Sequence, residues 1–414
     1  MVIVAELNHK LPLQITIEQK MPDPIKVLIV EDSPTVAAIL RHLIESDAAF
    51  QLVGVASNGA EAIRMTAHHH PQVITMDVNM PHMSGLEATE YIMAHNPTPI
   101  LVITASLARQ DIDLSFKMLS AGALEIIEKP TAEEWARDGG KLLERLKLLS
   151  RIKVITHLRG KSRSAIQPLP PTTPNPQVVP RRDMDNATAP LDPSKIYQPP
   201  TPKPFVRGTN PLNSAIADRT LLKAHFKILG IAASTGGPPA LSRLLKELPA
   251  DFPLPILLVQ HIPSGFSIGL AEWLNGETPL RVKNASEGEI PLPGTIYLST
   301  DDRHLAVYKD GRLHLDDSPA RFSLRPSADI TFESMSLAWP GETLAVILTG
   351  MGRDGSIGME SLKRAGGYNI AQDEATSVIF GMPKSAIERG VIDKVLALND
   401  IAPFLKIITK SETH

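Results

Sequence analysis

The chain has 414 residues, with 42 Lys and Arg against 45 Asp and Glu, and a formal net charge of -3. Its length suits two domains that each bury a core, and the balanced charge argues against nucleic acid as a partner. It has no cysteine, which excludes disulfides, thiolate metal sites and a cysteine nucleophile.

The leading segment, residues 1–24, mixes short apolar runs with Glu6, Lys10 and Glu18 and forms no signal-peptide core. We expect an N-terminal extension that carries no chemistry. No stretch of the chain approaches the roughly 20 apolar residues of a membrane span. We therefore expect a cytoplasmic protein without membrane insertion.

Residues 25–151 alternate short apolar runs with longer amphipathic segments, which predicts a doubly wound (βα)5 domain with a parallel sheet. A capping-box pattern at Thr131 and Glu134 indicates a last helix that runs to about Arg151. The predicted strands are Lys26 to Val30, Gln51 to Ala56, Val73 to Met76, Ile100 to Thr104 and Leu124 to Ile127.

Residues 152–225 form a proline-rich linker, in which prolines recur every few positions between 161 and 213. Such a density leaves no packed helix or strand. It is typical of an extended tether, and plain disorder is the alternative for its middle. Either way, two folding units are separated.

Residues 226–408 return to the alternating pattern and predict a second α/β domain with a parallel sheet. We expect a helix over Pro239 to Leu248 and a local hairpin or excursion within the polar stretch Asp301 to Ser323. The predicted strands are Ile228 to Ala233, Ile256 to Gln260, Thr295 to Leu298 and Thr343 to Leu348.

Acidic and polar residues end or follow four predicted strands of the first domain: Glu31, Asp32, Asp77, Thr104 and Lys129. Carboxyl ends of parallel strands share one edge of the sheet, where such folds bind ligands. Clustered carboxylates suit Mg²⁺, and Asp77 would attack a phosphoryl group held by Thr104 and Lys129. The alternative is that each Asp caps the following helix.

The motifs Val30-Glu31-Asp32-Ser33, Asp77 to Pro81, Thr104-Ala105 and Lys129-Pro130 resemble those of response-regulator receivers. The resemblance implies that Asp77 is the phosphorylation site and that Glu31, Asp32, Asp77 and the Asn79 carbonyl hold Mg²⁺. It also implies that Thr104 and Lys129 bind the phosphoryl group. Ile126 stands where many receivers carry an aromatic switch residue, so the usual aromatic readout is in doubt.

The run His68-His69-His70 is a weak metal candidate, because neighbouring helical side chains splay about 100° apart. We expect a solvated helix C-terminus there.

Ser234 lies in Ser234-Thr235-Gly236-Gly237-Pro238, between a predicted strand and a helix. Glycines permit a tight turn that presents the hydroxyl beside backbone N–H groups, as a nucleophile requires. Glycine-rich loops before helices also bind anions, so the loop alone does not decide the chemistry.

His261 and Asp354 also lie at strand ends, which gives Ser234 a candidate base and a candidate acid. Each has a structural alternative: a buried histidine, and a cap for the helix after Asp354. The chain order of serine, histidine and acid differs from that of α/β-hydrolases, and no G-x-S-x-G surrounds Ser234.

The motifs Ala233 to Pro238, Gln260-His261, Thr349 to Gly355, Gln372 to Glu374 and Gly381 to Pro383 closely resemble those of the chemotaxis protein-glutamate methylesterases, the CheB family. The resemblance implies Ser234, His261 and Asp354 as catalytic residues, oxyanion support from Thr235 and Met351, and no cofactor for ester hydrolysis. Glutamine deamidation is implied as a second activity.

Receiver and esterase together predict an enzyme that phosphorylation activates, with the unphosphorylated receiver covering the Ser234 site. The implied partners are a histidine kinase and the cytoplasmic helices of methyl-accepting receptors. The alternatives are a non-catalytic docking or phosphate-sink module, and the same esterase chemistry in another signalling array.

Overall fold

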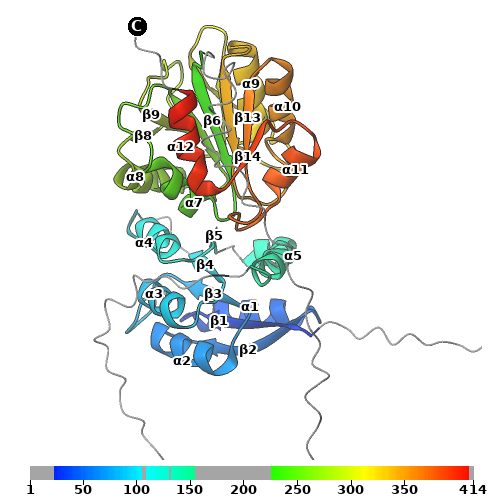
Figure 1. Cartoon of the computed structure of the whole chain (residues 1–414). Helices are drawn as coiled ribbons and strands as arrows, with labels where there is room; N and C mark the ends of the chain where they lie inside the picture. The colour runs from blue at the N-terminus through cyan, green and yellow to red at the C-terminus, as the bar shows by residue number, and fades with distance from the viewer. Residues whose placement is uncertain (1–22, 105–108, 130–131, 153, 155–224, 410–414) are drawn as a thin grey trace, which may run out of the picture.

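The computed structural model describes residues 23–104, 109–129, 132–152, 154 and 225–409. Thr131 and the proline-rich stretch lie outside these residues. The described chain forms two α/β units, one above the other in Figure 1. We call them the first unit (β1 to α5) and the second unit (β6 to α12).

The first unit is a five-stranded parallel sheet in the order β2-β1-β3-β4-β5, which confirms the predicted (βα)5 fold. Strands β3 and β4 are buried along their whole length, since helices cover both faces of the sheet. The elements are β1 (Ile25–Val30), α1 (Pro34–Glu45), β2 (Phe50–Ala56), α2 (Gly59–His69), β3 (Val73–Asp77), α3 (Gly85–His95), β4 (Ile100–Thr104), α4 (Arg109–Ser120), β5 (Glu125–Glu128) and α5 (Ala132–Leu149).

The second unit is a seven-stranded parallel sheet in the order β14-β13-β12-β6-β7-β9-β8. Its elements are β6 (Ile228–Ala233), α7 (Gly237–Leu245), β7 (Ile256–Gln260), α8 (Ser267–Glu277), β8 (Arg281–Asn284), β9 (Thr295–Leu298), α9 (Ala328–Ala338), β12 (Thr343–Ile347), α10 (Ser356–Arg364), β13 (Tyr368–Gln372), α11 (Met382–Glu388), β14 (Lys394–Leu396) and α12 (Leu398–Ile408). All four predicted strands are confirmed to within one residue; β8, β13 and β14 were not predicted.

The polar stretch after β9 contains the antiparallel hairpin β10 (His304–Val307) and β11 (Leu313–Asp316), separate from the main sheet. The predicted hairpin is thus confirmed. His68 and His69 occupy the last turn of α2, and His70 follows with φ of 48°, as expected for a helix C-terminus. Within the described residues, no helix combines the length and apolar character needed to cross a bilayer.

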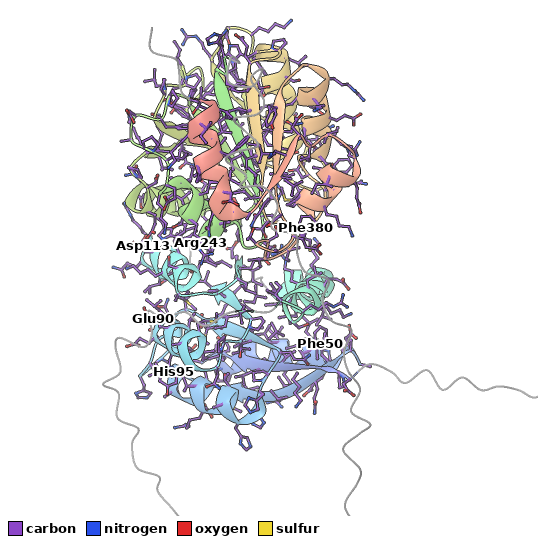
Figure 2. The ribbon with its side chains drawn as sticks, in the orientation of Figure 1. Phe50, Glu90, His95, Asp113, Arg243 and Phe380 are labelled. Atoms are coloured by element: carbon purple, nitrogen blue, oxygen red, sulfur yellow. The ribbon has the colours of Figure 1, made fainter. Side chains whose placement is uncertain are left out.

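The two units contact each other through helix α4 of the first and helices α7 and α8 of the second. The Phe116 ring stacks on that of Trp273, with centroids 5.5 Å apart. Gly269 packs so closely that a Cβ there would lie 2.1 Å from Cγ2 of Ile112. Figure 2 shows Arg243 of α7 at the same boundary, above α4. This packing brings strand β5 to the carboxyl end of β6.

Candidate functional site

The sheet edge of the first unit gathers the predicted acidic cluster. Ligand atoms of Glu31, Asp32 and Asp77 all lie within 4.8 Å of one another. The Nζ of Lys129 is 2.8 Å from Oε2 of Glu31 and 2.8 Å from Oδ2 of Asp77. Three carboxylates and one ammonium therefore meet at the edge of the sheet where the parallel strands β1, β3, β4 and β5 have their carboxyl ends.

Burial raises the pKa of both Glu31 and Asp77, against the hydrogen bonds from Lys129, which act to lower it. Burial also acts to lower the pKa of Lys129, but its hydrogen bonds to Asp77 and Glu31 outweigh that effect and raise it. The candidate ligand atoms of this cluster are all carboxylate oxygens, and the three acidic groups outnumber the one ammonium group. Its donors fit a hard divalent cation such as Mg²⁺.

Two further predicted residues flank this cluster. Thr104 is buried at the end of β4, and its carbonyl accepts the Lys129 N–H at 2.7 Å. The side-chain amide of Asn79 donates to Oδ1 of Asp111 at 2.6 Å. This bond does not involve the backbone carbonyl of Asn79, the predicted Mg²⁺ ligand. Ile126 is buried and faces the second unit.

The loop after β6 presents Ser234 at the sheet edge of the second unit. Gly236 has φ of 74°, a conformation that glycine adopts without strain, and the Gly237 N–H closes the turn on the Ser234 carbonyl at 2.7 Å. Nε2 of Gln260 donates to the carbonyls of Ser234 and His261, each at 2.9 Å. The amide thus ties two neighbouring strand ends together.

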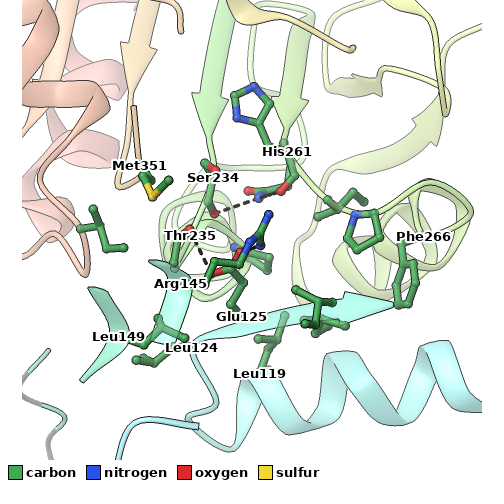
Figure 3. A pocket seen from close by; sticks show the side chains of 18 of the residues that line it. Leu119, Leu124, Glu125, Arg145, Leu149, Ser234, Thr235, His261, Phe266 and Met351 are labelled. Carbon is green, nitrogen blue, oxygen red and sulfur yellow. Dashed lines mark hydrogen bonds and ion pairs between the residues drawn. The ribbon is translucent and has the colours of Figure 1, made fainter. Parts of the chain in front are cut away.

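His261 and Asp354 are in direct contact: His261 Nε2 is 2.9 Å from Asp354 Oδ2. With Nε2 bonded to the carboxylate, Nδ1 is the ring atom left to accept a proton from Ser234. No hydrogen bond joins Ser234 to His261 in the described chain; such bonds often tighten only with substrate. Figure 3 shows Ser234 and His261 on adjacent strand ends, with Met351 beside them.

Asp354 is buried and receives three hydrogen bonds from the start of helix α9. Ser327 Oγ donates at 2.7 Å, and the backbone N–H groups of Ala328 and Asp329 donate at 2.6 and 3.1 Å. Burial acts to raise the pKa of Asp354, but the hydrogen bonds from His261, Ser327 and Ala328 lower it. Asp354 is therefore ionised at neutral pH, and the helix it caps is α9 rather than the helix that follows it.

The loop around Gly350 is held against Ser234 by the remaining motif residues. Gln372 accepts the Thr349 N–H at 2.7 Å, and the N–H groups of Gly381 and Met382 bond the Gly350 carbonyl at 3.1 and 2.9 Å. A Cβ on Gly350 would lie 2.8 Å from the Ser234 Cβ. This close approach places the Met351 backbone next to the serine.

A cavity of about 390 Å³ lies between the units, lined by Ser234, His261 and Met351 from one side and by Glu125, Ile126 and Arg145 from the other. The Thr235 hydroxyl donates to Glu125 Oε2 at 3.2 Å, and the Gly236 N–H bonds the Leu124 carbonyl at 3.3 Å. Glu125 also pairs with Arg145, and burial raises its pKa. The first unit thus covers the mouth of the Ser234 site (Figure 3).

Sequence reasoning missed three residues of this arrangement: Glu125, Ser327 and Asp329. Glu125 lies in a strand of another unit, and no local pattern connects it to Ser234. Ser327 directly precedes helix α9, and serine is common at this N-cap position, so the sequence pattern could have identified it. Asp329 lies in the first turn of α9, where acidic residues are common, and this pattern alone does not point to a role in the site.

Comparison with known proteins gives two family models on this chain: the response regulator receiver domain over residues 27–147 and the CheB methylesterase over residues 229–405. The chain is 40% identical to protein-glutamate methylesterase/protein-glutamine glutaminase 4 of Myxococcus xanthus, over 92% of this chain and 96% of the relative. It is 36% identical to a protein of the same name, numbered 2, from Anaeromyxobacter dehalogenans, over 94% and 98%. The crystal structure of the Thermotoga maritima CheB methylesterase catalytic domain is 42% identical and covers 45% of this chain and 98% of that one, with a TM-score of 0.43.

Proposed function

We propose that this chain, which belongs to the CheB family of protein-glutamate methylesterases, hydrolyses glutamate methyl esters on chemotaxis receptors when its receiver is phosphorylated. The observation that carries the proposal is the bond of His261 to the buried Asp354 carboxylate beside Ser234, in a cavity that the receiver covers. The same site is proposed to deamidate receptor glutamines.

In the proposed reaction, Ser234 Oγ attacks the ester carbonyl while His261 Nδ1 takes the hydroxyl proton. The tetrahedral oxyanion receives hydrogen bonds from the loops of Met351 and Thr235. His261 then passes its proton to the departing methoxide, which leaves as methanol. The ionised Asp354 stabilises the imidazolium that forms in between. No cofactor takes part.

The second half of the reaction hydrolyses the glutamyl ester on Ser234. His261 removes a proton from water, the resulting hydroxide attacks the acyl carbon, and the proton returns to Ser234 Oγ as the free glutamate leaves. A glutamine side chain presents the same acyl carbon, with ammonia as the leaving group in place of methanol. One site therefore accounts for both activities.

In the receiver, Asp77 is the proposed phosphorylation site, with a histidine kinase as the phosphoryl source. Glu31, Asp32, Asp77 and the Asn79 carbonyl would hold Mg²⁺, which neutralises phosphoryl charge when bound. Lys129 and Thr104 bind phosphoryl oxygens. Lys129 has to exchange its contact with the Asp77 carboxylate for one with the phosphoryl group, and this change is the start of the switch.

The proposed division of the chain is an extension over 1–24, the receiver over 25–151, a linker over 152–225 and the hydrolase over 226–408. The proposed location is the cytoplasm, where the kinase and the cytoplasmic helices of the receptors are reached. Phosphorylation weakens the contact of the receiver with the loop of Ser234. A coupling free energy of about 1 to 3 kcal/mol gives a roughly 5- to 150-fold activation.

The test is methanol release from methylated receptor membranes by the wild type and by Ser234→Ala, each with and without a small phosphodonor and Mg²⁺. We expect serine-dependent release that the phosphodonor increases. Absence of release from every receptor tested, with Ser234 intact, would contradict the proposal and favour another ester substrate or a docking module.

A further inference from the structure

Two buried aspartates exchange helix caps behind the hydrolytic site. Asp354, in the loop before α10, accepts the backbone N–H groups of Ala328 and Asp329 in the first turn of α9. Asp329, in that same turn, accepts the N–H groups of Ile357 and Gly358 in the first turn of α10, at 2.9 and 2.8 Å. Asp354 thus satisfies free N–H groups of α9, the helix that carries Asp329. Asp329 satisfies free N–H groups of α10, the helix that follows Asp354.

Neither helix caps itself. The residues at the N-cap positions, Ser327 of α9 and Gly355 of α10, make no side-chain bond to their own helix. Ser327 instead gives its hydroxyl hydrogen to Asp354. The free N–H groups in the first turns of α9 and α10 therefore depend on Asp354 and Asp329, respectively, for hydrogen-bond acceptors.

The two helices are also in close contact at this point. A Cβ on Gly358 would lie 2.6 Å from the Asp329 carbonyl oxygen and 2.7 Å from the Phe332 Cβ. Such an approach leaves no slack between the turn that carries Asp329 and the turn that follows Asp354. A shift of α10 would move Asp354, and with it the carboxylate that bonds His261.

The position of Asp329 is electrostatically unfavourable. Its side chain is fully buried, and its Oδ2 has no hydrogen-bond partner among the described residues. The Nε of Arg321 lies 3.9 Å from this oxygen. Burial, together with the charge of Asp354, raises its pKa to about 6. Electrostatics therefore does not explain why an acid occupies position 329. Its hydrogen bonds to the first turn of α10 do.

We infer that Asp329 is a positioning residue of the hydrolytic site, which anchors α10 to the start of α9 and so fixes Asp354 against His261. The inference rests on the proposed function for the reaction it serves. It assigns Asp329 no contact with the substrate. Its effect is on the turnover of bound substrate rather than on substrate binding.

The experiment uses the full chain with phosphodonor and Mg²⁺ and compares the wild type, Asp329→Ala and Asp329→Asn. We measure kcat and KM for methanol release, and also the rate at which a fluorophosphonate probe labels Ser234. Alanine removes both acceptor contacts, and a misplacement of about 1 Å can reduce catalysis about 100-fold, so we expect kcat to fall at least about 10-fold with KM nearly unchanged. Asparagine keeps an oxygen acceptor and should restore kcat to within about threefold of wild type.

A second variant keeps the test valid if Asp329→Ala does not fold. Gly358→Ala pushes on the same contact from α10 and should also lower kcat and labelling. Gly276→Ala in α8, where a Cβ meets nothing within 4 Å, is the matched control for Gly358→Ala. Asp310→Ala is the control for Asp329→Ala, because Asp310 likewise accepts a backbone N–H, from Arg312 at 3.0 Å, in the turn between β10 and β11.

The inference is overturned if folded Asp329→Ala labels and turns over like the wild type, or if the controls lose as much kcat as the test variants. The probe needs no receptor, so the two failures are distinguishable. A wild type that labels at Ser234 but releases no methanol contradicts the proposed substrate, while the labelling rates still decide the role of Asp329.

Discussion

The hydroxyl of Thr235, next to the nucleophile, donates a hydrogen bond of 3.2 Å to Glu125 of the receiver. Glu125 is in turn paired with Arg145 of α5. A receiver side chain thus engages a residue of the proposed oxyanion loop directly. In the proposed regulation, the inactive arrangement therefore involves the catalytic loop itself as well as the route to it.

Glu125→Ala should raise the methanol release of the unphosphorylated enzyme. It removes the bond to Thr235 and the partner of Arg145, and one such contact corresponds to about 1 kcal/mol, or roughly fivefold in the closed-to-open ratio. Initial rates without phosphodonor check this. Glu128→Ala, on the exposed end of the same strand, is the control and should leave the basal rate unchanged.

The basal activity should also carry a pH dependence that originates in Glu125. Burial raises its pKa in the closed arrangement, so the closed form binds the proton more tightly than the open form does. Low pH therefore favours closure, and that preference is lost as pH rises through the raised pKa. The ratio of wild-type to Glu125→Gln basal rates should increase from pH 5 to pH 8; a constant ratio would contradict this origin.

Gly269→Ala should loosen the contact between α8 and α4. The new Cβ would lie 2.1 Å from Cγ2 of Ile112, so one helix has to move. We expect a several-fold higher basal rate and a smaller increase on phosphodonor addition. Gly276→Ala adds the same methyl group to the same helix in open space and should behave as wild type. Equal effects of the two changes would show that helix propensity, not the interface, is responsible.

Asp77→Asn should abolish stimulation by phosphodonor and Mg²⁺ while basal methanol release persists. The amide cannot accept the phosphoryl group, and the ion pair with Lys129 at 2.8 Å is lost. Methanol release measured against phosphodonor concentration should be flat for the variant and rise for the wild type. Stimulation that survives in Asp77→Asn would place the phosphorylated residue elsewhere.

Asp329→Asn should stabilise the hydrolase at neutral pH. The pKa of Asp329 is raised from 3.8 to about 6, so its contribution to stability is complete below pH 4 and is lost as pH rises through 6. Ionisation at pH 7.5 then costs about 3 kcal/mol, of which a neutral amide recovers a part. The Tm of the variant should exceed that of the wild type at pH 7.5 and match it near pH 4. A gain that is the same at both pH values would exclude ionisation as the cause.

Much of the fold was predictable from local pattern. Strands such as β6 and β7 are buried on both faces and appear in the sequence as continuous apolar runs bounded by turns. The edge strands β8 and β14 are short and carry charged residues, so they gave no comparable signal. Strand β13 contains the buried polar residues Asn369 and Gln372, which interrupt its apolar run.

The proximity of the site residues was predictable only in part. Ser234, His261 and Asp354 were expected together because parallel strands end at one edge. The partners of Asp354 were not, since they come from helix α9, 25 to 27 positions earlier in the chain. The contact of Glu125 with Thr235 spans 110 positions and two folding units, and it depends on how two separately formed surfaces fit.

The cavity of about 390 Å³ between receiver and hydrolase has walls from both units. A small molecule that filled it would bind the closed arrangement and would be released when the units part. By thermodynamic reciprocity, the same molecule would make phosphorylation of Asp77 less favourable to the extent that phosphorylation expels it. The binding of an inhibitor selected for this space would therefore depend on the signalling state of the cell, because the molecule would bind the resting enzyme and not the activated form.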